Sequence, residues 1–188
     1  MTSSPQLVFR RARPQDYPEV ARITRESYLQ AGHFDSADHP YVRKIQEVAE
    51  RAQQAEIWVA EQLLDSGPVL VGAVTLAQHG EPYAEIAQPG ELEVRMLVVD
   101  PQRQGAGIGR AMMRAIIDDA RGRPGLHAVS LTTGETWLVA HALYRSLGFQ
   151  RQVERDWLVP GEDDAAAADS EHYEVPDERR LRVYRLAL

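Results

Sequence analysis

The chain has 188 residues, with 21 Lys and Arg against 28 Asp and Glu, a formal net charge of −7 and no cysteine. A chain of this length can bury one hydrophobic core, so we expect a single domain over residues 1–188. The lack of cysteine excludes disulfides, thiolate metal sites and a cysteine nucleophile. The acidic balance argues against a nucleic-acid surface.

Targeting and metal motifs are missing from the sequence. No apolar run approaches the ~18 residues of a membrane helix, and the first residues lack the basic and apolar regions of a signal peptide. The six histidines do not follow metal-motif spacing. We therefore expect a cytoplasmic protein that contacts no membrane and binds no metal.

The first half of the chain predicts strands and helices in turn. A short strand is expected over residues 8–12, followed by a helix that ends near Gly32. Apolar residues at helical spacing predict a second helix over 41–52. Two runs of strand-forming residues, 57–61 and 69–76, predict a hairpin.

The second half predicts a strand over 91–99, another over 128–132, and a helix over about 135–147. Gly148 stands where a helix commonly stops. Two last strands are expected over 150–159 and 181–188. We expect the acidic, low-complexity stretch 162–171 to form the loop between them.

The most informative segment follows the apolar run 96–99. That run predicts a buried strand, and Asp100-Pro101 is a turn signal. Glycines then occupy alternate positions 105, 107 and 109, and apolar residues resume at helical spacing. A strand, a glycine loop and a helix start aim free N–H groups and the positive end of a helix dipole at a phosphate. Glycine suits this loop because a Cβ would keep phosphate oxygens away from the amides.

Two common phosphate loops do not fit. A Walker A loop ends in Gly-Lys-Ser/Thr, but Gly109 is followed by Arg110-Ala111, and Lys44 is the only lysine. A dinucleotide-binding fingerprint needs its third glycine three places after the second, but Gly109 lies two places after Gly107.

A third loop fits better. Gln104-Gly-Ala-Gly107-Ile-Gly109 resembles the Gln/Arg-x-x-Gly-x-Gly/Ala loop with which the GNAT superfamily of N-acetyltransferases holds the pyrophosphate of acetyl-CoA. Upstream, residues 93–101 are similar to that superfamily's fourth strand. Downstream, Ala140-His-Ala-Leu-Tyr144-Arg-Ser-Leu-Gly-Phe149 resembles its Ala-x-x-Leu-Tyr-x-x-x-Gly-Phe helix end. The resemblance covers roughly residues 90 to 150.

The resemblance implies a fold and an activity. The fold is α/β with a mixed, mostly antiparallel sheet of about seven strands and about four helices, splayed between the fourth and fifth strands. The activity is direct transfer of an acetyl group from acetyl-CoA to a primary amine in a ternary complex. The resemblance also implies the residues that bind acetyl-CoA. These are Leu97, Val98 and Val99 for the pantetheine arm, and Gln104, Gly105, Ala106, Gly107, Ile108, Gly109 and Arg110 for the pyrophosphate.

Local charge suits a polyanionic ligand despite the acidic chain. Residues 100–123 carry five arginines against three aspartates, which gives +2. Arg103 and Arg110 flank the loop and are the better candidates for phosphate contact. The other three arginines are equally explained as solvated helix charge.

Tyr144 and Glu93 are the candidate catalytic residues. The resemblance implies that the phenol of Tyr144, protonated at neutral pH, donates a proton to the departing thiolate. It places Glu93 as the base that deprotonates the amine, directly or through water. Because strands alternate faces, Glu93 shares a face with Glu91 and Arg95, and a solvated Glu93–Arg95 pair is the alternative. Further candidates for the base are Glu91, Tyr28 and Tyr41.

One position departs from the family pattern. The superfamily often has Asn seven residues before the tyrosine, where it contacts CoA, and this chain has Trp137. His141 could compensate, although we expect it at a surface or lining a groove.

The acceptor is not named by the sequence. Specificity is expected from the first helix–loop–helix, where His33, Phe34, Asp35, His39 and Tyr41 have polar or aromatic reach. An acidic cleft with aromatic residues would suit a cationic amine, carried by a small molecule or a protein. The chain could be a monomer or a homodimer.

Two other functions stay open. The first is a non-catalytic acyl-CoA-binding sensor or partner-binding module. The second, a GNAT-like toxin acting on charged tRNA, is disfavoured because the chain lacks a basic face.

Overall fold

The computed structural model describes residues 6–32, 34, 36–158 and 180–188. In this part of the chain one eight-stranded sheet has the order β1-β2-β3-β4-β5-β8-β6, with β7 also paired to β8. The β4–β5 pair is parallel and the other pairs are antiparallel. The strands are β1 Leu7–Arg11, β2 Glu56–Leu64, β3 Gly67–Gln78, β4 Glu91–Val99, β5 Ala128–Gly134, β6 Gln150–Arg151, β7 Trp157–Leu158 and β8 Arg180–Ala187.

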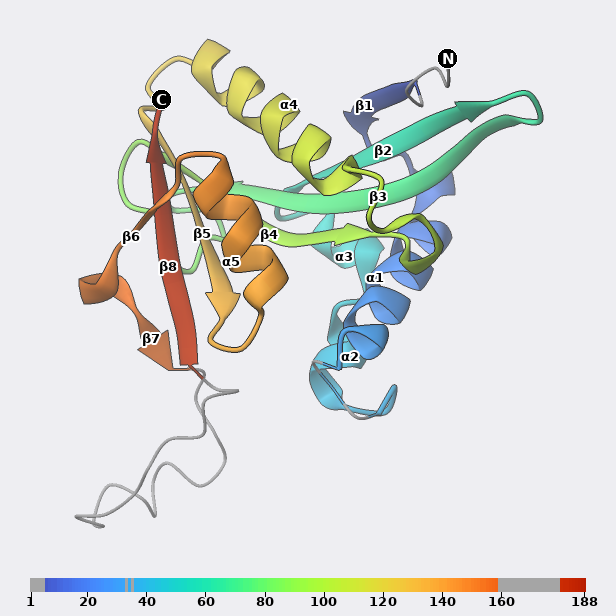
Figure 1. Ribbon diagram of the computed structural model, residues 1–188, viewed down its shortest axis with the longest axis horizontal. Coiled ribbons are helices and arrows are strands. Elements are labelled where there is room, and N and C mark those ends of the chain that lie inside the picture. Colours follow the sequence, from blue (N-terminus) through green and yellow to red (C-terminus); the bar gives the residue numbers. More distant parts are fainter. Residues whose placement is uncertain (1–5, 33, 35, 159–179) are drawn as a thin grey trace.

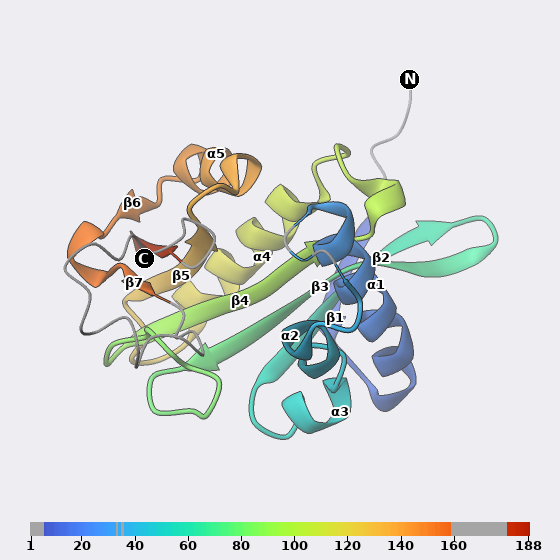
Figure 2. The same ribbon diagram turned by 90° about the horizontal axis from the view of Figure 1, so that it is seen from below.

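Helices cover both faces of the sheet (Figure 1). One face carries α4 and α5, and the other carries α1, α2 and α3 (Figure 2). The α-helices are α1 Tyr17–Gln30, α2 Pro40–Lys44, α3 Val48–Arg51, α4 Ile108–Gly122 and α5 Leu138–Ser146, with 3-10 turns at Pro14–Asp16, Pro101–Arg103 and Val153–Arg155.

Each face of the sheet has its own apolar cluster. Beneath α4 and α5 the cluster includes Met112, Ile116 and Leu131. On the other face Val20 and Ile23 of α1 are packed with residues of β2 and β3. The alternation of β-strand side chains supplies both clusters. None of the helices in the described residues is long and apolar enough to cross a membrane.

The predicted mixed, mostly antiparallel sheet is confirmed, with three local corrections. The helix predicted over 41–52 is broken into α2 and α3. The strand predicted over 150–159 is reduced to β6 and β7 around a 3-10 turn, and the helix predicted from 135 starts at Leu138. The acidic stretch 162–171 lies outside the described residues.

The break between α2 and α3 has a side-chain cause. The carbonyl of Ile45 accepts a 2.6 Å hydrogen bond from Nη1 of the buried Arg51. Gln46 turns back to donate to the carbonyl of Val42. These side chains take up carbonyls near the helix end, as capping groups do.

β4 and β5 separate after a short ladder. They pair only from Glu91 opposite Ala128 to Val94 opposite Leu131. Beyond this point β4 continues beside β3 and β5 continues beside β8, so the two strands diverge (Figure 1). Backbone groups of β4 after Val94 that face β5 are therefore outside the β4–β5 ladder.

A bulge marks the point of divergence. The β3–β4 register shifts between Ala73 and Thr75, and Met96 has a φ of +51°. A non-glycine residue in this region is strained, and such bulges bend a strand. The splay expected between the fourth and fifth strands is confirmed.

Candidate active site

The glycine loop lies between β4 and α4 and begins with an anchored turn. The carboxylate of Asp100 accepts the N–H of Gln102 at 2.9 Å and pairs with Arg22 of α1 at 2.6 Å. Pro101 cannot continue the β-ladder because it lacks an N–H. The turn thus fixes where the loop leaves the sheet.

The loop presents main-chain donors at the start of a helix. Gly107, the residue before α4, has a φ of +78°, and Gly105 has a φ of +81°. Within the described residues, the backbone N–H groups of Gly105 through Arg110 donate to no other group of the protein. A Cβ built on Gly107 has no heavy atom within 4 Å. These free donors at the positive end of a helix dipole fit a pyrophosphate.

The arginines around the loop differ in whether they form ion pairs or hydrogen bonds within the protein. Arg121 pairs with Asp118, and Arg123 pairs with Asp119 and with Glu56 of β2. Arg103 donates to the side chain of Gln62 at 3.3 Å. No ion pair within the described chain occupies Arg110, which leaves it available to an anion.

Leu97, Val98 and Val99 lie at the end of β4 that runs beside β3 but is not paired with β5. The side chains of Leu97 and Val99 pack on the cluster beneath α4, and Val98 packs on the opposite cluster. Their side chains are thus committed to the two cores. Main-chain groups are what this segment can offer to a ligand between the diverging strands.

Tyr144 lies on the buried face of α5. Its ring contacts Phe149 and Tyr184, with centroid distances of 5.9 and 6.2 Å. Burial raises the pKa of its phenol to about 12. The hydroxyl is therefore protonated at every physiological pH.

Glu93 is buried, with 0% of its surface exposed. Its Oε2 accepts the backbone N–H groups of Glu85, Ile86 and Ala87 at 2.8, 2.8 and 3.0 Å. Its Oε1 is buried and has no hydrogen-bond partner in the part of the chain that the structure describes, and Arg95 Nε lies 3.7 Å from it. Burial raises the pKa of Glu93 although the three N–H groups and Arg95 act to lower it.

Glu91, Glu93 and Arg95 share one face of β4 as predicted, but none of the three is a solvated surface charge. Burial acts to raise the pKa of Glu91, and hydrogen bonds from Arg155, the Gln88 N–H and Arg185 outweigh it, lowering the pKa to about 2. Arg95 donates to the Tyr83 carbonyl and pairs with Glu85. The three side chains therefore tether the segment between β3 and β4.

Aromatic residues from α1, α2 and α5 meet beside the splay. The ring of Tyr28 lies 6.1 Å from Phe34, 6.2 Å from Tyr41 and 6.2 Å from Trp137. Tyr28 donates a hydrogen bond to the Tyr41 hydroxyl, and burial raises the pKa of both phenols. Trp137, at the position of the family's Asn, thus packs in this aromatic cluster.

The aromatic cluster contains most of the residues expected to contact the acceptor. The His39 ring lies 4.6 Å from that of Phe34 in a tilted arrangement, so the cluster includes Phe34, His39 and Tyr41. His33 and Asp35 lie outside the described residues.

Charges of both signs lie near the aromatic cluster, since the Glu85 carboxylate also acts on Tyr41. Arg95 and Arg51 both interact electrostatically with Tyr28 and Tyr41. Arg51 is 1% exposed, its Nε has no partner in the described chain, and burial lowers its pKa. Burial of Arg51 was not predicted, because an arginine on a polar helix face ordinarily lies in solvent.

His141 was expected at a surface and is instead buried, with 3% exposed. Its Nε2 lies 3.0 Å from the Gly134 carbonyl and its Nδ1 lies 2.9 Å from the Tyr184 hydroxyl. A carbonyl only accepts, so Nε2 carries the proton and Nδ1 accepts from Tyr184. Burial lowers the pKa of His141, and the residue links α5 to the end of β5 and to the middle of β8.

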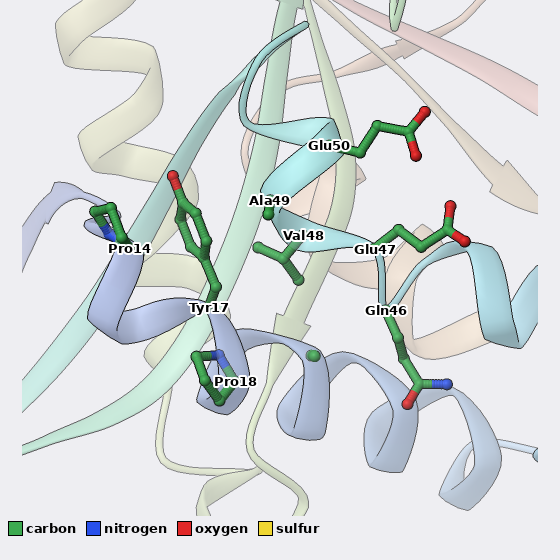
Figure 3. Close-up of a pocket in the computed structure, with 9 residues that line it drawn as sticks. Pro14, Tyr17, Pro18, Gln46, Glu47, Val48, Ala49 and Glu50 are labelled. Atoms are coloured by element: carbon green, nitrogen blue, oxygen red, sulfur yellow. The ribbon is translucent and has the colours of Figure 1, made fainter.

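A separate groove of about 560 Å³ lies between α1 and α3. Figure 3 shows Tyr17 and Pro18 on one side of it and Val48 and Ala49 on the other. None of the candidate catalytic or loop residues lines it. The groove is therefore distinct from the site between β4 and β5.

Residues 17–149 match the family model described as the acetyltransferase (GNAT) family. This match spans the splayed strands, the glycine loop and the helix of Tyr144. The chain belongs to the GNAT acetyltransferase family.

Curated relatives include two acetyltransferases with different names. The chain is 42% identical over 86 residues to the N-alpha-acetyltransferase RimI of Mycobacterium tuberculosis, covering 46% of this chain and 49% of the relative. It is 34% identical over 120 residues to a mycothiol acetyltransferase of Cellulomonas flavigena, covering 61% of this chain and 34% of the relative. The chain thus spans about half or less of the length of these relatives.

Solved GNAT structures share the fold at low identity. A putative acetyltransferase from Salmonella typhimurium, solved with its cofactor acetyl-CoA, has a TM-score of 0.63 at 18% identity, covering 97% of this chain and 94% of that one. A putative acetyltransferase from Acinetobacter baylyi has a TM-score of 0.67 at 15% identity, covering 100% and 95%. The GNAT fold implied by the sequence motifs is confirmed.

Proposed function

We propose that this chain is an acetyl-CoA-dependent N-acetyltransferase that moves the acetyl group directly to a primary amine in a ternary complex. The main support for the proposal is that the divergence of β4 from β5 lies next to the glycine loop. The end of β4 that is not paired with β5 leads, through the turn at Asp100, into the loop whose N–H groups from Gly105 to Arg110 have no acceptor among the described residues. The relatives named above carry acetyltransferase names, which supports the same reaction class.

The binding roles follow from which groups are free. Gln104, Gly105, Ala106, Gly107, Ile108, Gly109 and Arg110 would hold the pyrophosphate, chiefly through main-chain N–H groups. Main-chain groups of Leu97, Val98 and Val99 would hold the pantetheine arm where the strands diverge. Acetyl-CoA supplies an activated thioester carbonyl.

Glu93 is proposed to take the proton of the amine. A primary ammonium group with a pKa near 10.4 must lose a proton before it can attack a carbonyl. The raised pKa of Glu93 makes it a stronger base than an exposed glutamate, and its free Oε1 can receive the proton. Glu91 is a poor alternative because two arginines hold its carboxylate.

Tyr144 is proposed to supply a proton to the departing sulfur. The carbon–nitrogen bond forms, the carbon–sulfur bond breaks, and the sulfur needs a proton to leave as a thiol. With a pKa of about 12, the phenol keeps its proton until the sulfur becomes anionic. The net products are an amide, free CoA and one proton released by the ammonium group.

The acceptor is proposed to be an amine with an apolar or aromatic neighbouring group. The aromatic cluster around Tyr28 offers ring surface, and the nearest cations are Arg51 and Arg95. Glu85 also acts on Tyr41 and pairs with Arg95, so the charges around the cluster do not exclude a polycation. Compounds with a free α-amine, such as peptides, are the first acceptors to test, because one relative is named an N-alpha-acetyltransferase.

A non-catalytic acyl-CoA sensor is the alternative. It would need the loop but neither Glu93 nor Tyr144. The experiment measures release of the free CoA thiol from acetyl-CoA with a panel of peptides, amino sugars, amino acids and polyamines. Turnover that depends on an amine, and falls by ~10²–10⁴-fold in Glu93→Gln, supports the enzyme. Tight acetyl-CoA binding without amine-dependent release from any member supports the sensor.

A further inference from the structure

Two residues paired across β4 and β5 each carry a buried polar atom with no hydrogen-bond partner among the described residues. These atoms are Glu93 Oε1 and Ser130 Oγ, and both residues are 0% exposed. An unsatisfied buried polar atom costs about 1–3 kcal/mol, so such atoms usually mark a bound water or a functional group.

The sheet register brings the two side chains together. Glu93 is paired with Ser130 in the parallel β4–β5 ladder. Paired residues on neighbouring strands lie about 4.8 Å apart along the hydrogen-bonding direction, with side chains on the same face. Glu93 and Ser130 are therefore neighbours that do not bond directly to each other.

The charged groups around this pair are already engaged. Arg95 lies 3.7 Å from Glu93 Oε1 but donates to Tyr83 and pairs with Glu85. On β8, Arg185 is paired in register with Ser130, but its guanidinium bonds to Glu91, which also binds Arg155. None of these groups satisfies Ser130 Oγ.

We propose that Ser130 holds a water molecule against Glu93 Oε1, and that this water carries the proton from the acceptor amine to Glu93. A buried water needs two to four polar partners, and Ser130 Oγ and Glu93 Oε1 provide two. The inference rests on the proposed function, since it names a positioning residue for the same reaction.

The place of the pair in the sheet suits this role. Glu93 and Ser130 are the last pair but one before β4 and β5 diverge. A water between them lies at the apex of the splay, next to the space where the acetyl group and the amine would meet. The segment bonded to Oε2 fixes the carboxylate of Glu93 in place. A water molecule would therefore connect Glu93 to the amine.

The proton transfer balances. Ser130 donates its hydroxyl hydrogen to the water, and the water donates one hydrogen to Glu93 Oε1, which leaves a lone pair of the water for the amine. When the ammonium N–H bond breaks, the water takes that proton and passes its own hydrogen to Glu93. Ser130 is unchanged at the end.

The first test uses the full chain without any acceptor. The pKa of the Glu93 carboxyl is measured by carbon-13 NMR in the wild type and in Ser130→Ala, with Glu93→Gln to assign the signal. Because a water that donates to the carboxylate stabilises its charged form, Ser130→Ala should raise the pKa of Glu93 by roughly one unit. Thr24→Val, which removes a buried hydroxyl bonded within α1, should not.

The second test uses the pH dependence of amine-dependent thiol release. Ser130→Ala should lower kcat by ~10-fold and move the acidic limb upward with the Glu93 pKa, and Ser130→Cys serves if Ser130→Ala does not fold. An unchanged Glu93 pKa and an unchanged pH profile would overturn the inference while leaving the acetyltransferase activity standing. If the wild type shows no amine-dependent release, the proposed function fails, and the NMR titration alone then decides the water site.

Discussion

Replacing Tyr144 with phenylalanine separates the role of the hydroxyl group from the packing of the ring. The ring packs against Phe149 and Tyr184, so Tyr144→Phe keeps the packing and removes one hydroxyl. Acetyl-CoA affinity should stay within about two-fold, and the free energy of unfolding should change by less than about 1 kcal/mol. A loss of turnover then reports on the proton.

The magnitude follows from the pKa of Tyr144. A phenol with a pKa of about 12 gives a complete proton to a thiolate of pKa about 8.5 only against ~3.5 units, or ~5 kcal/mol. We therefore expect Tyr144 to act mainly by donating a strong hydrogen bond as the sulfur becomes anionic. This places the fall in kcat near the lower end of the range for general acids, at ~10²-fold.

The assay is steady-state thiol release with the best amine, followed from about pH 6 to 10. Wild-type kcat should show no alkaline limb from Tyr144 in this range, because the phenol titrates near 12. Tyr184→Phe is the matched control, since it removes a buried hydroxyl that donates to His141 and should lower stability but not kcat. Full turnover by Tyr144→Phe would refute the assignment and make Tyr144 a packing residue.

Two further changes test the loop and the tethering face of β4. Gly107→Val should weaken acetyl-CoA binding at least ~10-fold by calorimetry, because its Cβ enters the space in front of the free amides. The control is Gly125→Val, at a similar φ of +82° and equally open, which should cost comparable strain but leave the affinity unchanged. If the two variants bound acetyl-CoA equally well, the loop would not be part of the binding site. Because the pKa of Glu91 is lowered to about 2, its contribution to stability is complete above pH ~4.5 and is lost as the pH falls towards 2. The difference in unfolding free energy between wild type and Glu91→Gln should therefore shrink over that window in urea titrations, and a difference that is constant with pH would contradict the ion-pair account.

Local patterns were enough to predict the strand, the glycine loop and the helix start that form the proposed pyrophosphate site. The apolar run of β4, the turn at Asp100 and the spaced glycines depend on neighbours within a few residues, and they were placed correctly. The break in the helix predicted over 41–52 was not foreseen. It depends on Arg51 reaching back to the Ile45 carbonyl, which apolar spacing cannot show.

The candidate site was predicted in part for the same reason. Alternation along a strand placed Glu91, Glu93 and Arg95 on one face, but could not show that this face is buried under the segment before β4. His141 was misplaced because its partners, Gly134 and Tyr184, are brought close only by the folded sheet. A polar residue on a helix ordinarily faces water unless distant partners satisfy it.

The three N–H groups held by Glu93 limit which residues can replace it. Aspartate is one methylene too short to reach them, and alanine leaves three buried donors unpaired at about 1–3 kcal/mol each. Glutamine alone keeps an oxygen for the segment 85–87 while losing the basic carboxylate. Any substitution of Glu93 other than glutamine therefore disturbs the segment between β3 and β4 as well as removing the base. A homologue that lacks the glutamate needs other acceptors for the N–H groups of that segment.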